Sequence, residues 1–351
     1  MRDSISTHRR QLIASTLAAT AAGLAGWMLP GVAAAQPKLR TSGRAALAGS
    51  KRVVLGSVAL ACLTERQRQI SVGGGFRRGA AGSNFVKTTL AGLSDADFQA
   101  AADAAHAAAV EGLQARGFEV MDPAALVALL KADGLVQAQG SSHSFPEGNQ
   151  QSSKAAMWGA SVYGGYVSMP NWTPAAGGLA GLSSMGLVVA GRKVDTLFRK
   201  HAAEAGIGIV GLLIGVSPVR IEASFGSDWR VPDAFGRGGQ TQTGTLTTET
   251  GLSSHPLLTR MALYPVSGDE AGEIALEDEI GIQGGIGTLS DTTSGVTQGA
   301  QAVGNFLSMF GGSGRSNSTA NYTLQGDAAA YVAGTRALSV DVVGALAGGL
   351  S

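Results

Sequence analysis

The side chains best suited to acid–base or nucleophilic chemistry are spread thinly along this chain. The histidines after residue 35 are His106, His143, His201 and His255. No two of them are spaced to bind one metal ion from a single helix or strand. His143 lies beside Ser142 and Ser144 in a polar segment, but no Gly-x-Ser-x-Gly motif accompanies it. A hydrolase that uses His143 as a base is therefore an alternative only, and the sequence assigns no catalytic residue, cofactor or metal.

Cys62 is the only cysteine, and it lies within the apolar run Val53–Leu63. A thiol in such surroundings is more often a small buried hydrophobic group than a nucleophile. We therefore expect Cys62 to be buried and structural. A single cysteine also excludes a disulfide bond within the chain.

The densest group of charges lies between residues 269 and 279. Its carboxylates belong to Asp269, Glu270, Glu273, Glu277, Asp278 and Glu279. Residues 273–282 alternate between apolar and acidic side chains, which predicts a strand with most of its carboxylates on the solvated face. Such charges protect a strand against edge-to-edge aggregation. The alternative is a cation site in the acidic segment 269–279, because calcium is bound by carboxylates that converge from a loop.

Four large aromatic residues follow one another within a glycine-rich, polar part of the sequence. They are Trp158, Tyr163, Tyr166 and Trp172. Aromatic side chains that gather on a surface are typical of a binding site for a ligand or a partner. The alternative interpretation is a local core beneath a long loop.

Two glycine clusters, at residues 73–79 and 281–287, resemble phosphate-binding loops only superficially. Neither has the spacing of a dinucleotide fingerprint, and neither precedes a predicted helix. A phosphate loop needs the N-terminus of a helix. We therefore predict that both clusters form turns.

The first 35 residues have the three parts of an export signal. Arg9 and Arg10 precede a mildly apolar stretch, and small residues lead to a cleavage position between Ala35 and Gln36. The arginine pair predicts the twin-arginine route, with an ordinary Sec signal as the alternative. We expect a protein of the periplasm, soluble or peripheral to the outer membrane, with no retained transmembrane helix.

Composition narrows the class of function further. Removal of residues 1–35, with three arginines and one aspartate, reduces the charged residues from 26 basic and 25 acidic to 23 and 24. A near-neutral chain without a basic stripe is not expected to bind nucleic acid. Gly accounts for 52 of 351 residues, about twice the usual share, which favours long glycine-rich loops.

The hydrophobic pattern predicts an α/β fold, with α+β as the alternative: a mixed sheet with flanking helices. We expect strands at 51–64, 69–72, 84–90, 118–121, 161–168, 207–216, 219–223, 241–250, 257–266, 273–282 and 321–325. We expect helices at 94–117, 123–132, 192–205, 296–310 and 327–346, and loops at 135–155, 170–184 and 225–239. Residues 36–50 should form a flexible arm. Residues 51–351 should form one compact unit, with a potential subdivision into 51–134 and 156–351.

The segment Lys51–Gly134 resembles the N-terminal α/β unit shared by TolB, the penicillin-binding-protein activator lipoproteins and the curli secretion lipoprotein. The resemblance rests on the strand Arg52–Leu55, the helix after Ser94 and the sequence Gly117-Phe118-Glu119-Val120-Met121-Asp122. It covers about a quarter of the chain. It departs from those lipoproteins because no acylated N-terminal cysteine is present. The resemblance implies an envelope accessory or binding module, and it supplies no site residues.

These observations favour an exported, non-enzymatic envelope or assembly accessory protein with an envelope protein as its candidate partner. A periplasmic hydrolase and a soluble ligand-binding protein are the two alternatives. The sequence leaves the oligomeric state open.

Overall fold

The computed structural model describes residues 37–43, 50–72, 82–146, 152–168, 179–230, 239–267, 271–282, 284–294 and 317–350. Residues 37–351 form one compact unit. Arg9, Arg10, the cleavage position between Ala35 and Gln36, Trp172 and the helix predicted at 296–310 all lie outside the described residues.

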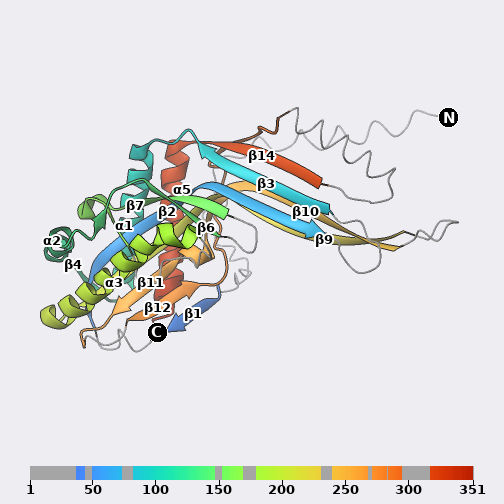
Figure 1. The fold of residues 1–351 in the computed structure, drawn as a ribbon. Coiled ribbons are helices and arrows are strands. Elements are labelled where there is room, and N and C mark those ends of the chain that lie inside the picture. Colours follow the sequence, from blue (N-terminus) through green and yellow to red (C-terminus); the bar gives the residue numbers. More distant parts are fainter. Residues whose placement is uncertain are drawn as a thin grey trace, which may run out of the picture. The chain divides into compact units, whose positions relative to one another are not determined.

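The predicted α/β fold with a mixed sheet is confirmed (Figure 1). Within the described residues, the principal sheet has twelve strands, with the path β1-β12-β11-β9-β2-β3-β14-β13. Beside this path, β10 pairs with β9, β4 and β7 pair with β2, and β6 pairs with β7. The pairs β2–β9, β2–β4 and β3–β14 are parallel. A separate two-stranded sheet joins β5 to β8.

The strands have the following bounds. They are β1 (Leu39–Ser42), β2 (Arg52–Val72), β3 (Gly82–Ala91), β4 (Glu119–Met121), β5 (Val136–Gln137), β6 (Ser141–Pro146), β7 (Ser152–Gly159), β8 (Tyr166–Val167), β9 (Gly208–Arg230), β10 (Gly239–Ser254), β11 (Arg260–Tyr264), β12 (Gly272–Leu276), β13 (Gly287–Asp291) and β14 (Asn317–Gly326). The described helices are α1 (Asp95–Ala115), α2 (Ala124–Ala132), α3 (Leu179–Ala205) and α5 (Ala328–Gly348), with short 3₁₀ turns at Ser161–Tyr163 and Pro256–Leu258.

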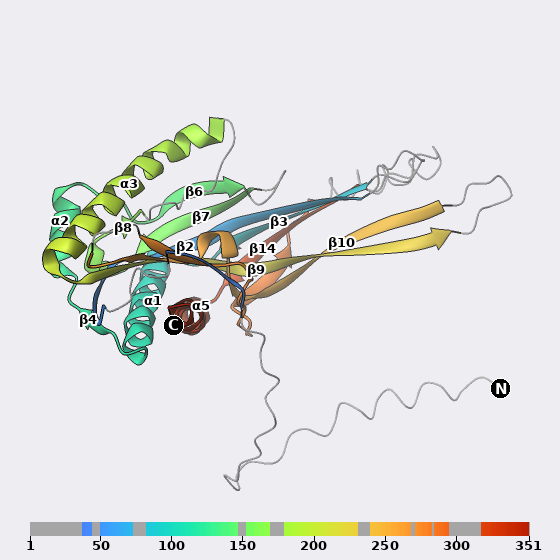
Figure 2. The ribbon, with the colours of Figure 1, turned by 90° about the horizontal axis from the view of Figure 1, so that it is seen from below.

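Helices cover both faces of the sheet at its base (Figure 2). On one face, α1 and α5 contribute Phe98, Leu113, Tyr331 and Leu338 to a core cluster with alternate residues of β2 and β9. On the other face, α2 and α3 build a second cluster around the intervening strand residues. Because both faces are buried, the base segments of β2 and β9 are continuous apolar runs and do not alternate.

The helix boundaries follow their predicted capping signals. Asp97 Oδ2 accepts hydrogen bonds from Ser94 N (2.8 Å) and Ser94 Oγ (2.7 Å) at the start of α1. Asp327 Oδ1 accepts from Ala330 N (2.8 Å) at the start of α5. Gly117 has a φ of +85°, a backbone conformation that favours glycine and ends the helix. The helices predicted at 94–117, 123–132 and 327–346 are therefore confirmed.

Among the described helices, α5 alone is long and apolar enough to cross a membrane, on length and composition only. In this structure α5 is a core helix. Tyr331, Leu338, Val342 and Leu346 are fully buried in the core cluster that also contains α1. The apolar character of α5 is thus explained by its packing on the sheet.

Several sequence-based predictions of local structure are wrong. Residues 135–155, predicted as a loop, contain β5, β6 and the start of β7. Residues 161–168, predicted as a strand, form a 3₁₀ turn and the short β8. Of the loop predicted at 225–239, residues 225–230 belong to β9 and Gly239 begins β10, and residues 231–238 lie outside the described residues. Edge hairpins built from Ser, Gly and Gln lack the apolar runs that reveal a strand.

The segments predicted at 36–50, 257–266 and 273–282 also differ. Residues 39–42, within the predicted flexible arm, form β1 and pair with β12. A 3₁₀ turn precedes β11 within 257–266. The strand predicted at 273–282 ends at Leu276, because the chain bends at residues 277–278. Helix α3 begins at Leu179, earlier than predicted at 192.

Candidate functional site: the forked hairpins

Strands β2 and β9 lie side by side at the base and then separate. Their parallel pairing runs from Val53 opposite Gly208 to Cys62 opposite Val216. Beyond this point each strand continues into its own antiparallel hairpin, β2 with β3 and β9 with β10. We call these two hairpins together the fork. Figure 1 and Figure 2 show β2, β3, β9 and β10 extending beyond the helices.

The register identifies which strand edges become vacant at the fork. Cys62 pairs with both Ala156 of β7 and Val216 of β9, so β7 and β9 occupy opposite edges of β2. Glu65 pairs with both Lys154 of β7 and Thr89 of β3. Strand β3 therefore takes the place of β9 on its edge of β2. Strand β9 leaves this edge with no strand partner on its inner side among the described residues.

Two arginines of β2 bond to the edge of β9 that β2 has left. Arg66 Nη1 donates to Val219 O (3.0 Å) and to Ser217 Oγ (3.2 Å), and Arg68 Nη1 donates to Ile221 O. Arg66 is buried, with 9% of its surface exposed. Buried backbone carbonyls without a hydrogen bond are costly. These guanidinium groups therefore replace a strand partner and hold the two hairpins together.

A β-bulge lies where β9 bends away. The register with β10 shifts between Thr250 and Ser253, so Pro218 faces the irregular step between the two regular ladders. A bulge is one of the few places in a sheet where the missing N–H of proline is tolerated. This explains how β9 continues through Ser217-Pro218, where the sequence predicted two separate strands.

The β9–β10 hairpin is amphipathic near the fork. Val219 and Ile221 are buried and Leu246 is partly buried against the same core cluster as Val86 of β3. On the opposite face, Arg220 forms ion pairs with Glu222 (3.6 Å) and Glu279 (3.7 Å). The β9–β10 hairpin thus directs its apolar face toward the core cluster and its charged face outward.

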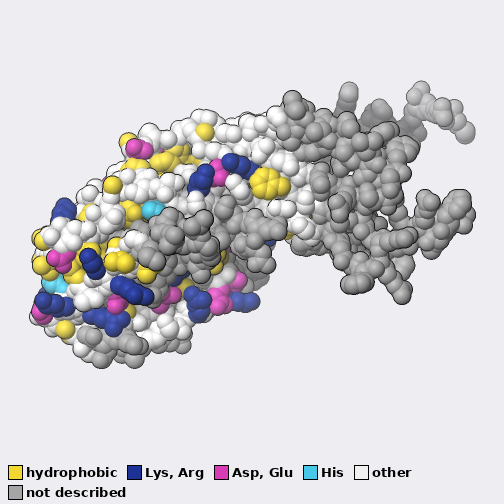
Figure 3. Space-filling view, viewed as in Figure 1, with side chains coloured by type: hydrophobic (Ala, Val, Ile, Leu, Met, Phe, Trp, Pro, Cys, Tyr) yellow, Lys and Arg dark blue, Asp and Glu magenta, His cyan; other side chains and the backbone are white. Residues whose placement is uncertain are grey.

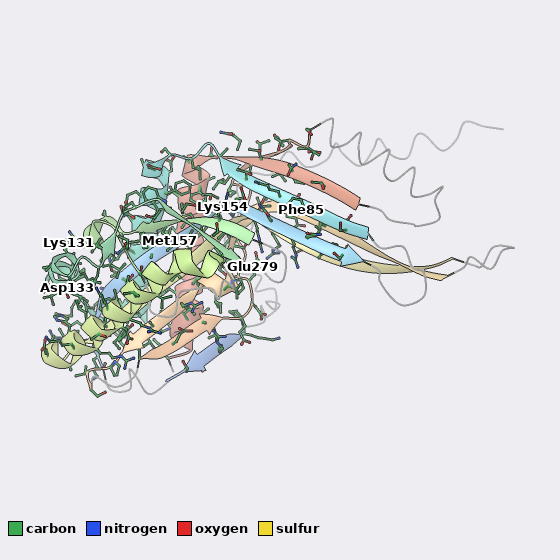
Figure 4. The ribbon with its side chains drawn as sticks, in the orientation of Figure 1. Phe85, Lys131, Asp133, Lys154, Met157 and Glu279 are labelled. Atoms are coloured by element: carbon green, nitrogen blue, oxygen red, sulfur yellow. The ribbon has the colours of Figure 1, made fainter. Side chains whose placement is uncertain are left out.

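Glu65 is the centre of a charge cluster on the face of β2 opposite Arg66 and Arg68. Its Oε2 atom accepts from Lys87 Nζ (2.8 Å) and lies 3.5 Å from Lys154 Nζ, and its Oε1 accepts from Gln67 Nε2 (2.7 Å). Partial burial opposes ionisation, but the bonds from Lys87 and Gln67 prevail and lower the pKa of Glu65. Figure 4 shows Lys154 at the point where the hairpin leaves the base, with Phe85 farther along it.

Two strands of the fork, β2 and β9, are several times longer than ordinary strands. Strand β2 has 21 residues and β9 has 23, or about 70–75 Å at the usual rise per residue, where about six residues is typical. Apart from a bridge between Ser253 and Gly281, β10 pairs with β9 alone among the described strands. The fork therefore presents long strand edges that no described strand covers.

Three of the four aromatic residues singled out in the sequence lie within the described residues, and these three do not form an exposed surface. Trp158, Tyr163 and Tyr166 have 5%, 0% and 1% of their surface exposed. Tyr163 Oη donates to Leu55 O (2.9 Å), and Trp158 stacks on Phe98 at 5.8 Å. The alternative interpretation, a local core, describes these three side chains.

His143 lies on the edge strand β6 and is half-buried. Its Nε2 atom is 3.0 Å from Tyr166 Oη, and burial lowers its pKa. The nearby Ser141 Oγ donates to Ala138 O (2.8 Å). His143 thus contacts the hydroxyl group of the buried Tyr166.

The structure also describes Cys62 and part of the acidic segment. Cys62 is fully buried, as predicted, and burial raises its pKa to about 12 although a hydrogen bond with Tyr331 opposes this shift. Of the acidic segment, Asp269 and Glu270 lie outside the described residues. Asp278 Oδ2 accepts from Lys38 N (3.2 Å). Within the described part of the chain, no three His, Cys, Asp or Glu side chains are grouped to hold a metal ion.

No protein-family model, characterised protein or solved structure matches this chain. The resemblance of residues 51–134 to the TolB-like unit therefore stays a prediction.

Sequence analysis missed the fork and its arginines. Arg66 and Arg68 alternate with polar residues directly after the apolar run of β2. The change from an apolar run to charged and polar residues indicates that one face of the strand is no longer buried. The partner of these arginines, about 150 residues away, could not be inferred from spacing.

Proposed function

We propose that this chain is an exported, non-enzymatic assembly protein of the cell envelope, which associates with further copies of itself through the strand edges of the fork. The observation that carries the proposal is β10: sixteen residues long and paired only with β9 over residues 239–250. Its location in the envelope rests on the predicted export signal alone.

Free strand edges are templates for pairing, and proteins normally keep them short, charged or covered. Here the edge of β10 combines great length with a threonine-rich sequence and one charge, Glu249. Beyond Glu65 the ladder between β2 and β7 ends, so β2 presents a second strand edge there. Strand addition supplies affinity through backbone hydrogen bonds.

A second copy is the favoured partner because one molecule offers two different edges on two hairpins. Pairing the β10 edge of one copy with the β2 edge of the next is a heterologous contact, which repeats from copy to copy. A single foreign strand would occupy only one of these edges. The contact leaves the helix-covered base unchanged.

A proline at Thr248 tests the proposal without breaking the hairpin. Val219 and Ile221 direct their carbonyls toward the arginines and away from β10. Their cross-strand neighbours Thr250 and Thr248 therefore form non-hydrogen-bonded pairs, with backbone groups that point outward. We expect the purified protein to be oligomeric by light scattering and Thr248→Pro to be shifted to the monomer.

Thr248→Val is the matched control, because it changes the same side chain but keeps the outward N–H. It should associate like the unmodified protein. A monomeric unmodified protein, or an oligomer that Thr248→Pro leaves intact, would show that the edge of β10 does not carry assembly.

Export is tested separately in cells. Replacing Arg9 and Arg10 by lysine keeps the charge but removes the pair that the twin-arginine route requires. We expect the variant precursor to stay in the cytoplasm, whereas the unmodified protein reaches the periplasm with Gln36 at its N-terminus. N-terminal sequencing and cell fractionation give the readout. Undiminished export of the lysine variant would assign the Sec route.

A further inference from the structure

A groove with a volume of about 870 Å³ lies between α2 and α3, away from the fork. One wall is the end of α2 and the turn after it, and the other is a stripe of residues along α3 from Val189 to Glu204. Figure 3 shows hydrophobic side chains bordered by lysines, arginines and a histidine over these two helices. Figure 4 marks Lys131 and Asp133 at the end of α2.

The groove has an apolar floor that is open to solvent. Leu129 on α2 and Val189 on α3 have 44% and 50% of their surface exposed, and both line the groove. Leu197 and the buried Leu135 line the same groove. Two of the six exposed large hydrophobic side chains in the described part of the chain thus belong to this one groove. Such a concentration indicates that an apolar group covers them.

Two cations on the rim have no carboxylate partner within the described residues. The ion pairs of α3 join Asp195 to Arg199 (2.9 Å) and Glu204 to Lys200 (3.9 Å). Arg192 and Lys193 are exposed and belong to neither pair. Glu204 lines the opposite end of the groove, about 16 Å away at the rise of a helix. The end near Arg192 and Lys193 is therefore where an anionic group would bind.

The length and the charges of the groove favour one kind of occupant. The stripe on α3 from Val189 to Glu204 is sixteen residues long, or about 22 Å. Its exposed apolar side chains suit a hydrocarbon chain, which makes carbon contacts at about 4 Å. Its two cations suit a single anionic head group.

We propose that this groove binds one single-chain anionic amphiphile, with its hydrocarbon chain along Leu129, Val189 and Leu197 and its carboxylate or phosphate beside Arg192 and Lys193. The ligand binds as a monomer from solution and not as part of a bilayer. This site is independent of the proposed assembly through the fork.

Calorimetric titration of the purified protein with dodecanoate, below its micelle concentration, tests the proposal. We expect saturable binding of one molecule per chain. Decanoate, two methylenes shorter, should bind about tenfold more weakly, from the free energy of burying each methylene. Dodecyltrimethylammonium has the same chain and the opposite charge, and it should bind at least tenfold more weakly than dodecanoate.

Variants place the ligand in the groove. Arg192→Gln with Lys193→Gln should weaken dodecanoate binding about tenfold and abolish the preference over the ammonium compound. The matched control is Lys51→Gln with Arg52→Gln, another exposed pair of adjacent cations. Val189→Ser should weaken binding, whereas Val340→Ser, at a valine of similar exposure on α5, should not.

Three results would overturn the proposal. The first is the absence of saturable dodecanoate binding. The second is equal binding of the anionic and cationic amphiphiles, or no effect of the groove variants. The third is binding only to phosphatidylglycerol vesicles and not to monomeric dodecanoate, which would identify a bilayer surface as the partner.

Discussion

The base of the sheet and the fork are built from the same two strands but obey different physical constraints. From Val53 to Leu63, β2 is buried on both faces by helices. Beyond Thr64 the same strand alternates, with Arg66 and Arg68 on one face and Glu65 and Gln67 on the other. The base is held by apolar packing over a large area. The fork is held by one apolar face, two arginines and a small ion cluster.

This difference indicates that the two parts of β2 have different structural roles. The base can fold as an ordinary layered α/β unit, because β2 and β9 have strand neighbours on both edges there. In the fork, β2 no longer pairs with β7 or β9, and the stability of this region comes from fewer and more polar contacts. Regions with fewer buried contacts open more readily than the core. The fork is therefore the part of the chain that gains most from contact with another copy.

Truncation of one buried aliphatic side chain in each region gives the largest contrast. Leu60 is fully buried in the base cluster, whereas Ile70 is 7% exposed and packs outside both core clusters. We expect Leu60→Ala to lower the free energy of unfolding by about 3 kcal/mol. Ile70→Ala should cost about half as much, because the site can collapse. Urea denaturation measures both, and equal losses would show that the fork is packed as tightly as the base.

Arg66→Met removes the donors to Val219 and Ser217 but keeps the length of the side chain. We expect a loss of about 2 kcal/mol, typical of buried hydrogen bonds from a charged group. Hydrogen exchange should accelerate at residues 217–223 and not in α1 or α5. Arg52→Met, at an exposed arginine on the same strand, should leave both measurements unchanged. Unaltered exchange in β9 after Arg66→Met would mean that the arginine does not hold the hairpins together.

Glu65→Gln should have the smallest effect, and that effect depends on pH. The pKa of Glu65 is lower in the folded protein than its ordinary value. The carboxylate therefore stabilises the fold above the unfolded pKa, and this stabilisation is lost as pH falls through the folded pKa. We expect a cost of about 1 kcal/mol at neutral pH, which disappears in acid. A cost that stays constant with pH would contradict the role of the ion cluster.

The parts of the fold that could be predicted are those governed by local sequence. Helix α1 begins at a Ser-x-x-Asp cap and ends before Gly117, and α5 begins at Asp327, so capping chemistry located them. The mixed sheet followed from apolar runs of strand length. The β6–β7 hairpin was missed because its Ser- and Gln-rich residues form an edge, where packing does not demand apolar side chains.

The candidate site could not be predicted because it depends on contacts between distant segments. Pro218 suggested a break in the chain, yet β9 continues because a bulge in β10 faces the proline. The carbonyls of Val219 and Ile221 meet arginines from another part of the sequence. The parallel pairing of β2 with β9, which ends at Cys62, is determined by tertiary packing. The hydrophobic periodicity of the sequence does not indicate it.

Cys62 and its position beneath α5 provide the molecule with an internal reporter. It is the only thiol in the chain, it is fully buried, and its pKa of about 12 leaves almost no thiolate at neutral pH. An alkylating reagent can react with it only after the core has opened, so the labelling rate measures the frequency of that opening. Because Cys62 does not react in the folded state, cysteines introduced along the hairpins can be labelled selectively with spin labels or cross-linkers. Cys62 then does not need to be replaced.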